Sequence, residues 1–175
     1  RLFVSQFVRR HQLEVPLIAA KKADKLTGEL VIDSSIYDEK SGQWVREPKP
    51  GRKPEPSDQE LVEEFNKLAS FTLDKKSGLA TVAVEYYSPQ MAKQWVDWLV
   101  ADLNQTMKER DLVEAERNIS YLKEQLAKTS VADMQTVFYK LIEEQTKTQM
   151  LAEVNQEYVF KTLDPAVVPE EKAKP

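Results

Sequence analysis

A long stretch without glycine, residues 88–157, constrains this chain more than any other feature. Its one proline, Pro89, directly follows Ser88. Serine is a favourable N-cap and proline is tolerated in the first turn of a helix, so the pair predicts where a helix begins. Apolar side chains then recur at three- and four-residue spacing, which is the period of a helix face. The stretch therefore predicts long helices, around which the rest of the chain is organised.

The helical pattern is interrupted once, around Ser130. Ser130 and Asp133 have the spacing of a capping box, so a second helix is predicted to begin there. The two helices, over residues 89–129 and 131–157, would fold back on each other as a hairpin with unequal arms. Residues 89–103 would extend past the end of the shorter arm, and we expect them to pack against a sheet.

The facing side of the hairpin is predicted from coiled-coil spacing. Apolar residues on the first helix step by three and four positions from Leu112 to Leu126. The returning helix starts with apolar residues but then meets Gln145 and Thr148. With so few apolar residues between the two helices, a hairpin on its own would bury little apolar surface. We therefore expect the hairpin to pack between subunits. The residues predicted to carry hairpin and subunit packing are Leu112, Ile119, Leu122, Leu126, Met134, Phe138 and Leu141.

A turn motif, D-x-x-[ST]-G, recurs and ends at Gly28, Gly42 and Gly78. Aspartate commonly opens a type I turn, and glycine closes it in the left-handed backbone region. Such turns join the strands of β-hairpins. A calcium-binding loop is the alternative, but the alternating oxygen ligands of such a loop are missing. The motif therefore predicts β-hairpins.

Strands and a linker are predicted from the residues around these turns. β-Branched and aromatic residues mark 69–74, 79–87 and 158–163 as strands, and these three segments are expected to form one sheet. Residues 47–58 are rich in proline and predict an extended surface linker, with a docking motif for aromatic-lined grooves as the alternative. Ser57 is expected to cap a short helix directly after this linker.

These elements together predict an α+β fold. A small mixed β-sheet covered by helices forms the base, and a long helical hairpin projects from it. The membrane-proximal base would comprise residues 1–87 and 158–168, and the hairpin residues 88–157. Further short helices are expected over residues 1–13 and from Pro16 onward.

Composition argues against several kinds of chemistry. The net charge of −4 does not suit a nucleic-acid backbone. With no cysteine and one histidine, His11, the chain offers no zinc or haem ligand set. Its glycines are not spaced for a phosphate-binding loop. Glu143 and Glu144 are adjacent and point to different helix faces, so they do not suggest a catalytic carboxylate pair. We predict no catalytic, cofactor-binding or metal-binding residues, and hence no enzyme.

A family resemblance is carried by three stretches of the second half of the chain. YSPQMAKQWVDWLVADLNQTMKERD, then AERNISYLKEQLAKT, and then IEEQTKTQMLAEVNQEYVFKTLDPAVVPEEKAKP closely resemble the Wzz-type polysaccharide chain-length determinants. These are polysaccharide co-polymerases of the Gram-negative inner membrane. In that family a periplasmic domain lies between two membrane helices. The stretch DPAVVPEEKAKP, with Pro165, Pro169 and Pro175, resembles the proline-rich stretch before the family's second membrane helix, and residues 169–175 would lead to that helix, which is missing from this sequence.

The resemblance implies a function without catalysis. The family sets the modal chain length of O-antigen or related surface polysaccharides, as part of lipopolysaccharide biosynthesis. Its members form homo-oligomeric rings and work with a separate polymerase in the inner membrane, with the growing glycan chain as a further candidate partner. The family's first strand would precede Arg1, and it is not present in this sequence.

Three other classes share parts of this pattern. A periplasmic adaptor of a secretion or efflux system also projects a helical hairpin, but its β-rich halves need more glycine than this chain has. A capsule or exopolysaccharide tyrosine autokinase shares the co-polymerase domain and adds a cytoplasmic P-loop kinase. A glycan-cleaving enzyme is the third alternative, and the lack of a carboxylate pair argues against it.

Overall fold

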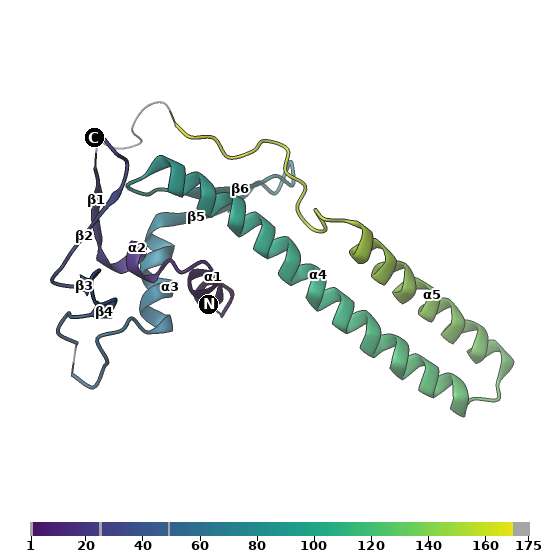
Figure 1. Ribbon diagram of the computed structural model, residues 1–175. Coiled ribbons are helices and arrows are strands. Elements are labelled where there is room, and N and C mark those ends of the chain that lie inside the picture. The colour runs from purple at the N-terminus through teal and green to yellow at the C-terminus, as the bar shows by residue number, and fades with distance from the viewer. Residues whose placement is uncertain (1, 25, 49, 170–175) are drawn as a thin grey trace. The chain divides into compact units, whose positions relative to one another are not determined.

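The computed structural model describes residues 2–24, 26–48 and 50–169, and it confirms the predicted α+β class (Figure 1). The chain divides into two compact units. The first holds the residues up to Asp97 together with those from Ala166 on, and the second runs from Trp98 to Pro165. The elements in chain order are α1 (Leu2–Arg10), α2 (Glu14–Ala19), β1 (Ala20–Ala23), β2 (Leu30–Ile32), β3 (Tyr37–Asp38), β4 (Gln43–Trp44), α3 (Asp58–Leu68), β5 (Ala69–Leu73), β6 (Ala80–Val84), α4 (Pro89–Lys128) and α5 (Ala132–Val154).

The core of the first unit is an aromatic cluster that joins α1, α3 and the start of α4. Phe7 on α1 packs edge-on against Phe65 on α3, with ring centroids 5.4 Å apart. The ring of Trp95 lies 6.2 Å from that of Phe65 and 4.4 Å from that of Tyr86. The hydroxyl of Tyr86 donates to the carbonyl of Pro16 at 2.5 Å, and burial raises the pKa of this hydroxyl. Trp95 thus packs on α3 and Tyr86, not on the sheet expected from the sequence.

Among the described residues, the strands pair only locally, in three antiparallel two-stranded sheets (Figure 1). The best formed is β5 with β6, whose register runs from Ala69 opposite Val84 to Leu73 opposite Ala80. The prediction of one mixed sheet that includes residues 158–163 is wrong, because that segment has no regular secondary structure. Its backbone is instead hydrogen-bonded by a side chain of α4, described below, so those groups are not available to a neighbouring strand.

The three aspartate-to-glycine turns are present as predicted. Gly28, Gly42 and Gly78 have φ angles of 73°, 68° and 72°, and each donates its N–H to the carbonyl of the aspartate that opens its turn. The carboxylate of each aspartate accepts a further N–H from the turn backbone. For Asp38 the largest effect on the pKa comes from a hydrogen bond that the Ser41 hydroxyl donates to its carboxylate. Together with the backbone hydrogen bonds, such contacts hold the pKa of each turn aspartate below its ordinary value.

The proline-rich linker before α3 is held by two arginines. Arg46 donates from Nε to the carbonyl of Pro54 at 2.7 Å and from Nη2 to the carboxylate of Glu60 at 2.8 Å. The hydrogen bonds between these two side chains raise the pKa of Arg46 and lower that of Glu60. Arg9 on α1 donates to the carbonyl of Pro56 at 3.2 Å. On both sides of residue 49 the linker contains no helix or strand, which fits the predicted surface segment.

Helix starts follow the sequence prediction in one case and depart from it in another. The hydroxyl of Ser57 accepts the N–H of Glu60 at 3.3 Å and caps α3 as predicted. The prediction of a capping box at Ser130 is wrong, because α5 begins at Ala132, one residue too late for it. The N-cap residue is Val131, whose side chain makes no capping hydrogen bond. The amide of Gln135 instead donates to the carbonyl of Thr129 at 3.0 Å and ties the first turn of α5 to the end of α4.

The predicted proline-containing segment is described only in part. Pro165 and Pro169 lie outside helices and strands, while Pro175 falls outside the described residues. Within the ranges that the structure describes, none of the helices combines the length and apolar character that crossing a membrane requires.

Replacement of Trp95 tests the aromatic core. Trp95→Ala should lower the free energy of unfolding by about 3–5 kcal/mol, the range for removal of a large buried side chain. Trp95→Phe should cost clearly less, because it keeps a ring between Phe65 and Tyr86 and because the indole N–H has no hydrogen-bond partner among the described residues. Urea denaturation followed by circular dichroism measures both changes. An equal loss for the two variants would contradict this account of the core.

Candidate interaction surface

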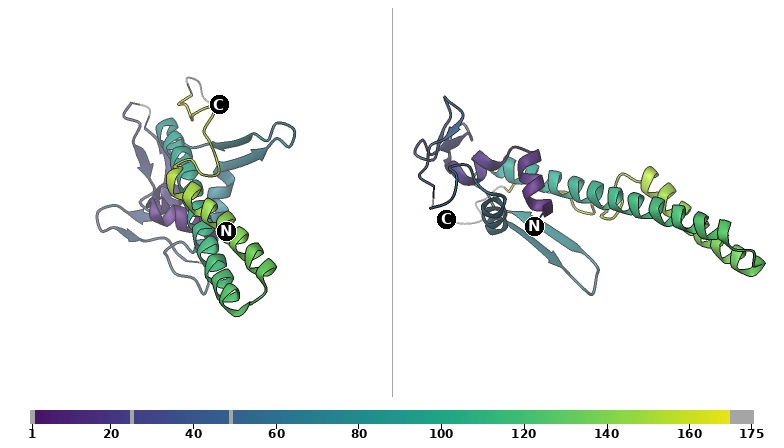
Figure 2. Two further views of the ribbon diagram at one scale, coloured as in Figure 1. Left: turned by 90° about the vertical axis from the view of Figure 1, so that its right-hand side faces the viewer. Right: turned by 90° about the horizontal axis from the view of Figure 1, so that it is seen from below.

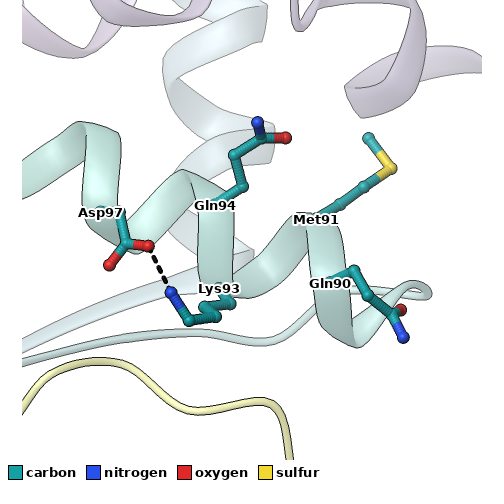
Figure 3. A pocket seen from close by; sticks show the side chains of 5 residues that line it. All are labelled: Gln90, Met91, Lys93, Gln94 and Asp97. Atoms are coloured by element: carbon teal, nitrogen blue, oxygen red, sulfur yellow. Dashed lines mark hydrogen bonds and ion pairs between the residues drawn. The ribbon is translucent and has the colours of Figure 1, made fainter.

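An open hollow of about 400 Å³ lies on the first turns of α4. It is lined by Gln90, Met91, Lys93, Gln94 and Asp97, and Figure 3 shows that these side chains point in different directions. Lys93 and Asp97 pair with each other at 2.6 Å. The described residues also contain no group of three or more histidine, cysteine or carboxylate side chains placed to hold a metal ion. The pocket does not bring polar groups together around one point, as a substrate site would.

The hairpin offers a more extensive candidate. α4 and α5 lie side by side and antiparallel in Figures 1 and 2. On α4, Ala115 is almost fully buried. The predicted seam residues around it, Leu112, Ile119, Leu122 and Leu126, are each half-buried. The α4 side of the predicted seam therefore faces inward along its whole length.

The α5 side of the seam differs from the prediction by about one residue. Phe138 is half-buried as expected, but Met134 and Leu141 are more exposed, at 45% and 39%. The side chains that turn inward include a continuous heptad pattern of three glutamines and three apolar residues, with Thr148 beside it. The members of the pattern are Gln135, Phe138, Ile142, Gln145, Gln149 and Ala152.

Polar contacts explain why this mixed face turns inward and fix which residues lie level with each other. The amide of Asn118 donates to Gln145 Oε1 at 3.3 Å across the middle of the hairpin. Near the open end, Lys108 donates to the carbonyl of Glu153 at 3.5 Å. Asn118 and Gln145 are half-buried, and an amide held away from water loses free energy when it has no partner, so their pairing favours one register over the others.

Asn104 on α4 holds the segment that follows α5. The Oδ1 atom of Asn104 accepts the N–H groups of Val159 and Phe160 at 3.0 and 2.8 Å, and its amide donates to the carbonyl of Phe160 at 2.9 Å. The hydroxyl of Tyr158 donates to the carboxylate of Asp111 at 3.1 Å. Burial and this contact raise the pKa of Tyr158. Asn104 itself is buried, and its three hydrogen bonds stand in for a strand partner.

One side of the hairpin remains apolar and uncovered near its closed end. Tyr121 on α4 is 61% exposed, and Met134, Val137 and Leu141 on α5 are 45%, 48% and 39% exposed. Helix geometry, at about 100° per residue, puts the four on the same lateral face of an antiparallel pair. We call these four residues the distal patch. Contiguous exposed apolar groups are a common feature of protein interaction surfaces.

Sequence reasoning missed this patch although the signal was present. Apolar residues on α5 form two stripes, one residue apart: Met134, Val137 and Leu141, beside Phe138 and Ile142. The sequence analysis assigned residues of both stripes to one helix interface, so it did not recognise the stripe of Met134, Val137 and Leu141 as a separate surface. Glu143 and Glu144, the carboxylates weighed as catalytic candidates, are both exposed. Glu143 is exposed and pairs with Lys147 at 2.9 Å, which lowers the pKa of Glu143.

No family model, curated protein or solved structure matches this chain.

Replacement of Asn104 tests its hydrogen bonds to the backbone of Val159 and Phe160. Asn104→Ala removes the acceptor of two backbone N–H groups, and each such bond contributes about 1 kcal/mol. We expect the amide hydrogens of Val159 and Phe160 to exchange with solvent about tenfold faster or more, measured by NMR or mass spectrometry. Asn118→Ala, at the middle of the hairpin, should leave these two amides protected. If both variants loosen them equally, Asn104 has no local role.

Proposed function

We propose that the chain is the periplasmic part of an inner-membrane regulator of surface-polysaccharide chain length, acting as an oligomeric scaffold rather than as a catalyst. The observation that carries the proposal is the distal patch. It presents four large apolar side chains that the described part of the chain leaves between 39% and 61% exposed. The hairpin that bears it has a seam diluted by glutamines. Such a hairpin is best stabilised by a neighbouring copy.

The energetics favour contact between copies that are already held close together. Full burial of a large apolar side chain contributes about 1.5–3 kcal/mol, so the patch supplies a modest contact and not a tight one. Tethering copies to one membrane raises their effective concentration to the millimolar range, at which a modest contact is populated. The partner is therefore a second copy, with the polymerase of the inner membrane as a separate protein beside the assembly.

The polysaccharide enters the proposal through the resemblance to Wzz-type chain-length determinants and not through a binding site. A scaffold of this kind would change polymer length by how it arranges the polymerase, because it has no chemistry of its own to offer. The pocket at Gln90 and the exposed carboxylates of the hairpin are not needed in this account.

Substitutions in the hairpin test the scaffold. Leu141→Glu adds a charge to the distal patch without entering the seam, and it should broaden or shorten the polysaccharide length distribution while polymerisation continues. Ile119→Glu puts a charge in the seam, where it should destabilise the hairpin by about 3 kcal/mol or more and have the same effect on length. Gel ladders of surface polysaccharide from complemented cells measure the distribution. Circular dichroism should show that only Ile119→Glu loses helix.

Variants of the groups considered for catalysis provide the control. Glu143→Gln and His11→Gln should leave the ladder unchanged, because neither side chain belongs to the seam or the distal patch. Immunoblots must show normal protein levels for each variant. Complete loss of polymer with either control variant, at normal protein level, would refute the non-catalytic scaffold.

A further inference from the structure

The sheet of β5 and β6 in the first unit has one entirely apolar face. Residues that lie opposite each other in an antiparallel pair share a face, and alternate pairs point to the same side. The side chains on one side are Ala69, Phe71, Leu73, Ala80, Val82 and Val84, and we call them the β5–β6 face. The other side carries only serine, threonine and alanine. Phe71 and Leu73 are each 57% exposed, so more than half of each side chain is uncovered in the described part of the chain.

Charge is confined to the turn between the two strands. Along residues 69–84 the only charged side chains are Asp74, Lys75 and Lys76, all of them in the turn. Two lysines and one aspartate give this segment a net charge of +1, although the whole chain has −4. The Asp74 carboxylate is engaged within the turn, where it accepts the backbone N–H of Lys76 and the hydroxyl of Ser77, each at 2.8 Å. Both lysines are exposed. Cations therefore border an apolar surface.

The β5–β6 sheet stands largely by itself. Figure 2 shows its loop end pointing away from α3 in both views. Leu79, next to the turn, is a further large apolar side chain that is 51% exposed. A two-stranded sheet alone in water is only marginally stable, and exposed strands usually carry charged side chains. These strands carry none, so the β5–β6 face fits a cover that accepts apolar side chains beside lysines.

We infer that the β5–β6 face and its turn bind the surface of a phospholipid bilayer that contains anionic lipids. Phe71 and Leu73 would enter the boundary between headgroups and acyl chains, as the apolar side chains of peripheral membrane contacts do. Lys75 and Lys76 would place their ammonium groups among the anionic headgroups, with their aliphatic stems along the apolar surface. The inference goes beyond the proposed scaffold function and does not depend on it.

The size of the face favours a lipid surface over a second copy of the chain. Each partner in a stable protein complex buries roughly 800 Å². A fully exposed aromatic side chain presents no more than about 250 Å², so Phe71 and Leu73 together fall well short of that area. A bilayer needs no matching shape, and it offers anionic headgroups to both lysines at once.

A fluorescent probe on the β5–β6 face reports its surroundings directly, because the chain has no cysteine of its own. The full chain with Leu73→Cys would carry the polarity-sensitive dye NBD. On addition of vesicles of equal parts phosphatidylglycerol and phosphatidylcholine, we expect the emission to shift to the blue and rise about twofold or more. Vesicles of phosphatidylcholine alone should give a much smaller change. NBD on Val154→Cys, a position that is 80% exposed on α5, is the matched control and should not respond.

Cosedimentation of the unlabelled chain with the same mixed vesicles tests the apolar side chains. Phe71→Thr combined with Leu73→Thr keeps residues that suit a strand and should weaken binding about tenfold or more. Leu151→Gln combined with Val154→Gln removes two other exposed apolar side chains, from α5, and should leave binding within about twofold. Circular dichroism should show equal folding for both double variants.

A second pair of variants tests the lysines. Lys75→Gln combined with Lys76→Gln should weaken binding to the mixed vesicles about tenfold or more, since each lysine near an anionic surface contributes about fivefold. Lys123→Gln combined with Lys140→Gln makes the same change of charge on the helical hairpin and should have little effect. Raising the salt concentration should weaken binding of the unmodified chain to these vesicles.

Three results would overturn the inference. The first is an unchanged probe at position 73 with every vesicle composition. The second is equal binding to vesicles with and without phosphatidylglycerol. The third is a blue shift that grows with protein concentration in the absence of lipid, because a second copy would then cover the face. None of these measurements involves polysaccharide, so a failure here leaves the scaffold proposal to its own test by Leu141→Glu.

Discussion

The hairpin depends on a few polar contacts between α4 and α5. The pair of Asn118 and Gln145 fixes the level at which the two helices meet, and Asn104 fixes the segment after α5. In an apolar seam several registers would be similar in energy, whereas an amide inside the seam loses its partner in all but one. The register that these polar contacts favour therefore determines which apolar residues of the hairpin stay exposed. The residues of the distal patch are among them.

The helices and turns could be predicted from the sequence because their causes are local. Ser57 caps α3 through its own side chain, and Pro89 begins α4 where its missing N–H is of no consequence. Gly28 and its equivalents close turns that need a positive φ. Each of these features depends on residues within a few positions of each other, so a single sequence contains the whole signal.

Features that depend on distant residues were predicted less well. Residues 158–163 have the composition of a strand, but Asn104, more than fifty positions away, binds their backbone (Asn104 to Phe160, 2.9 Å). On α5, Gln135 and Gln145 turn inward because acceptors and donors on α4 and its end are there to meet them. Apolar periodicity alone assigned Met134 and Leu141 to the seam.

The aspartate turns have a consequence for how the first unit responds to acid. Each turn carboxylate accepts hydrogen bonds in the folded state that hold its pKa below the ordinary value of 3.8. Such a group contributes stability at every pH above its unfolded pKa and loses that contribution only as pH falls through the lowered folded pKa. Mild acidification therefore leaves the three turns fully charged and closed. Acid unfolding of the first unit is therefore not expected to begin at these three turns.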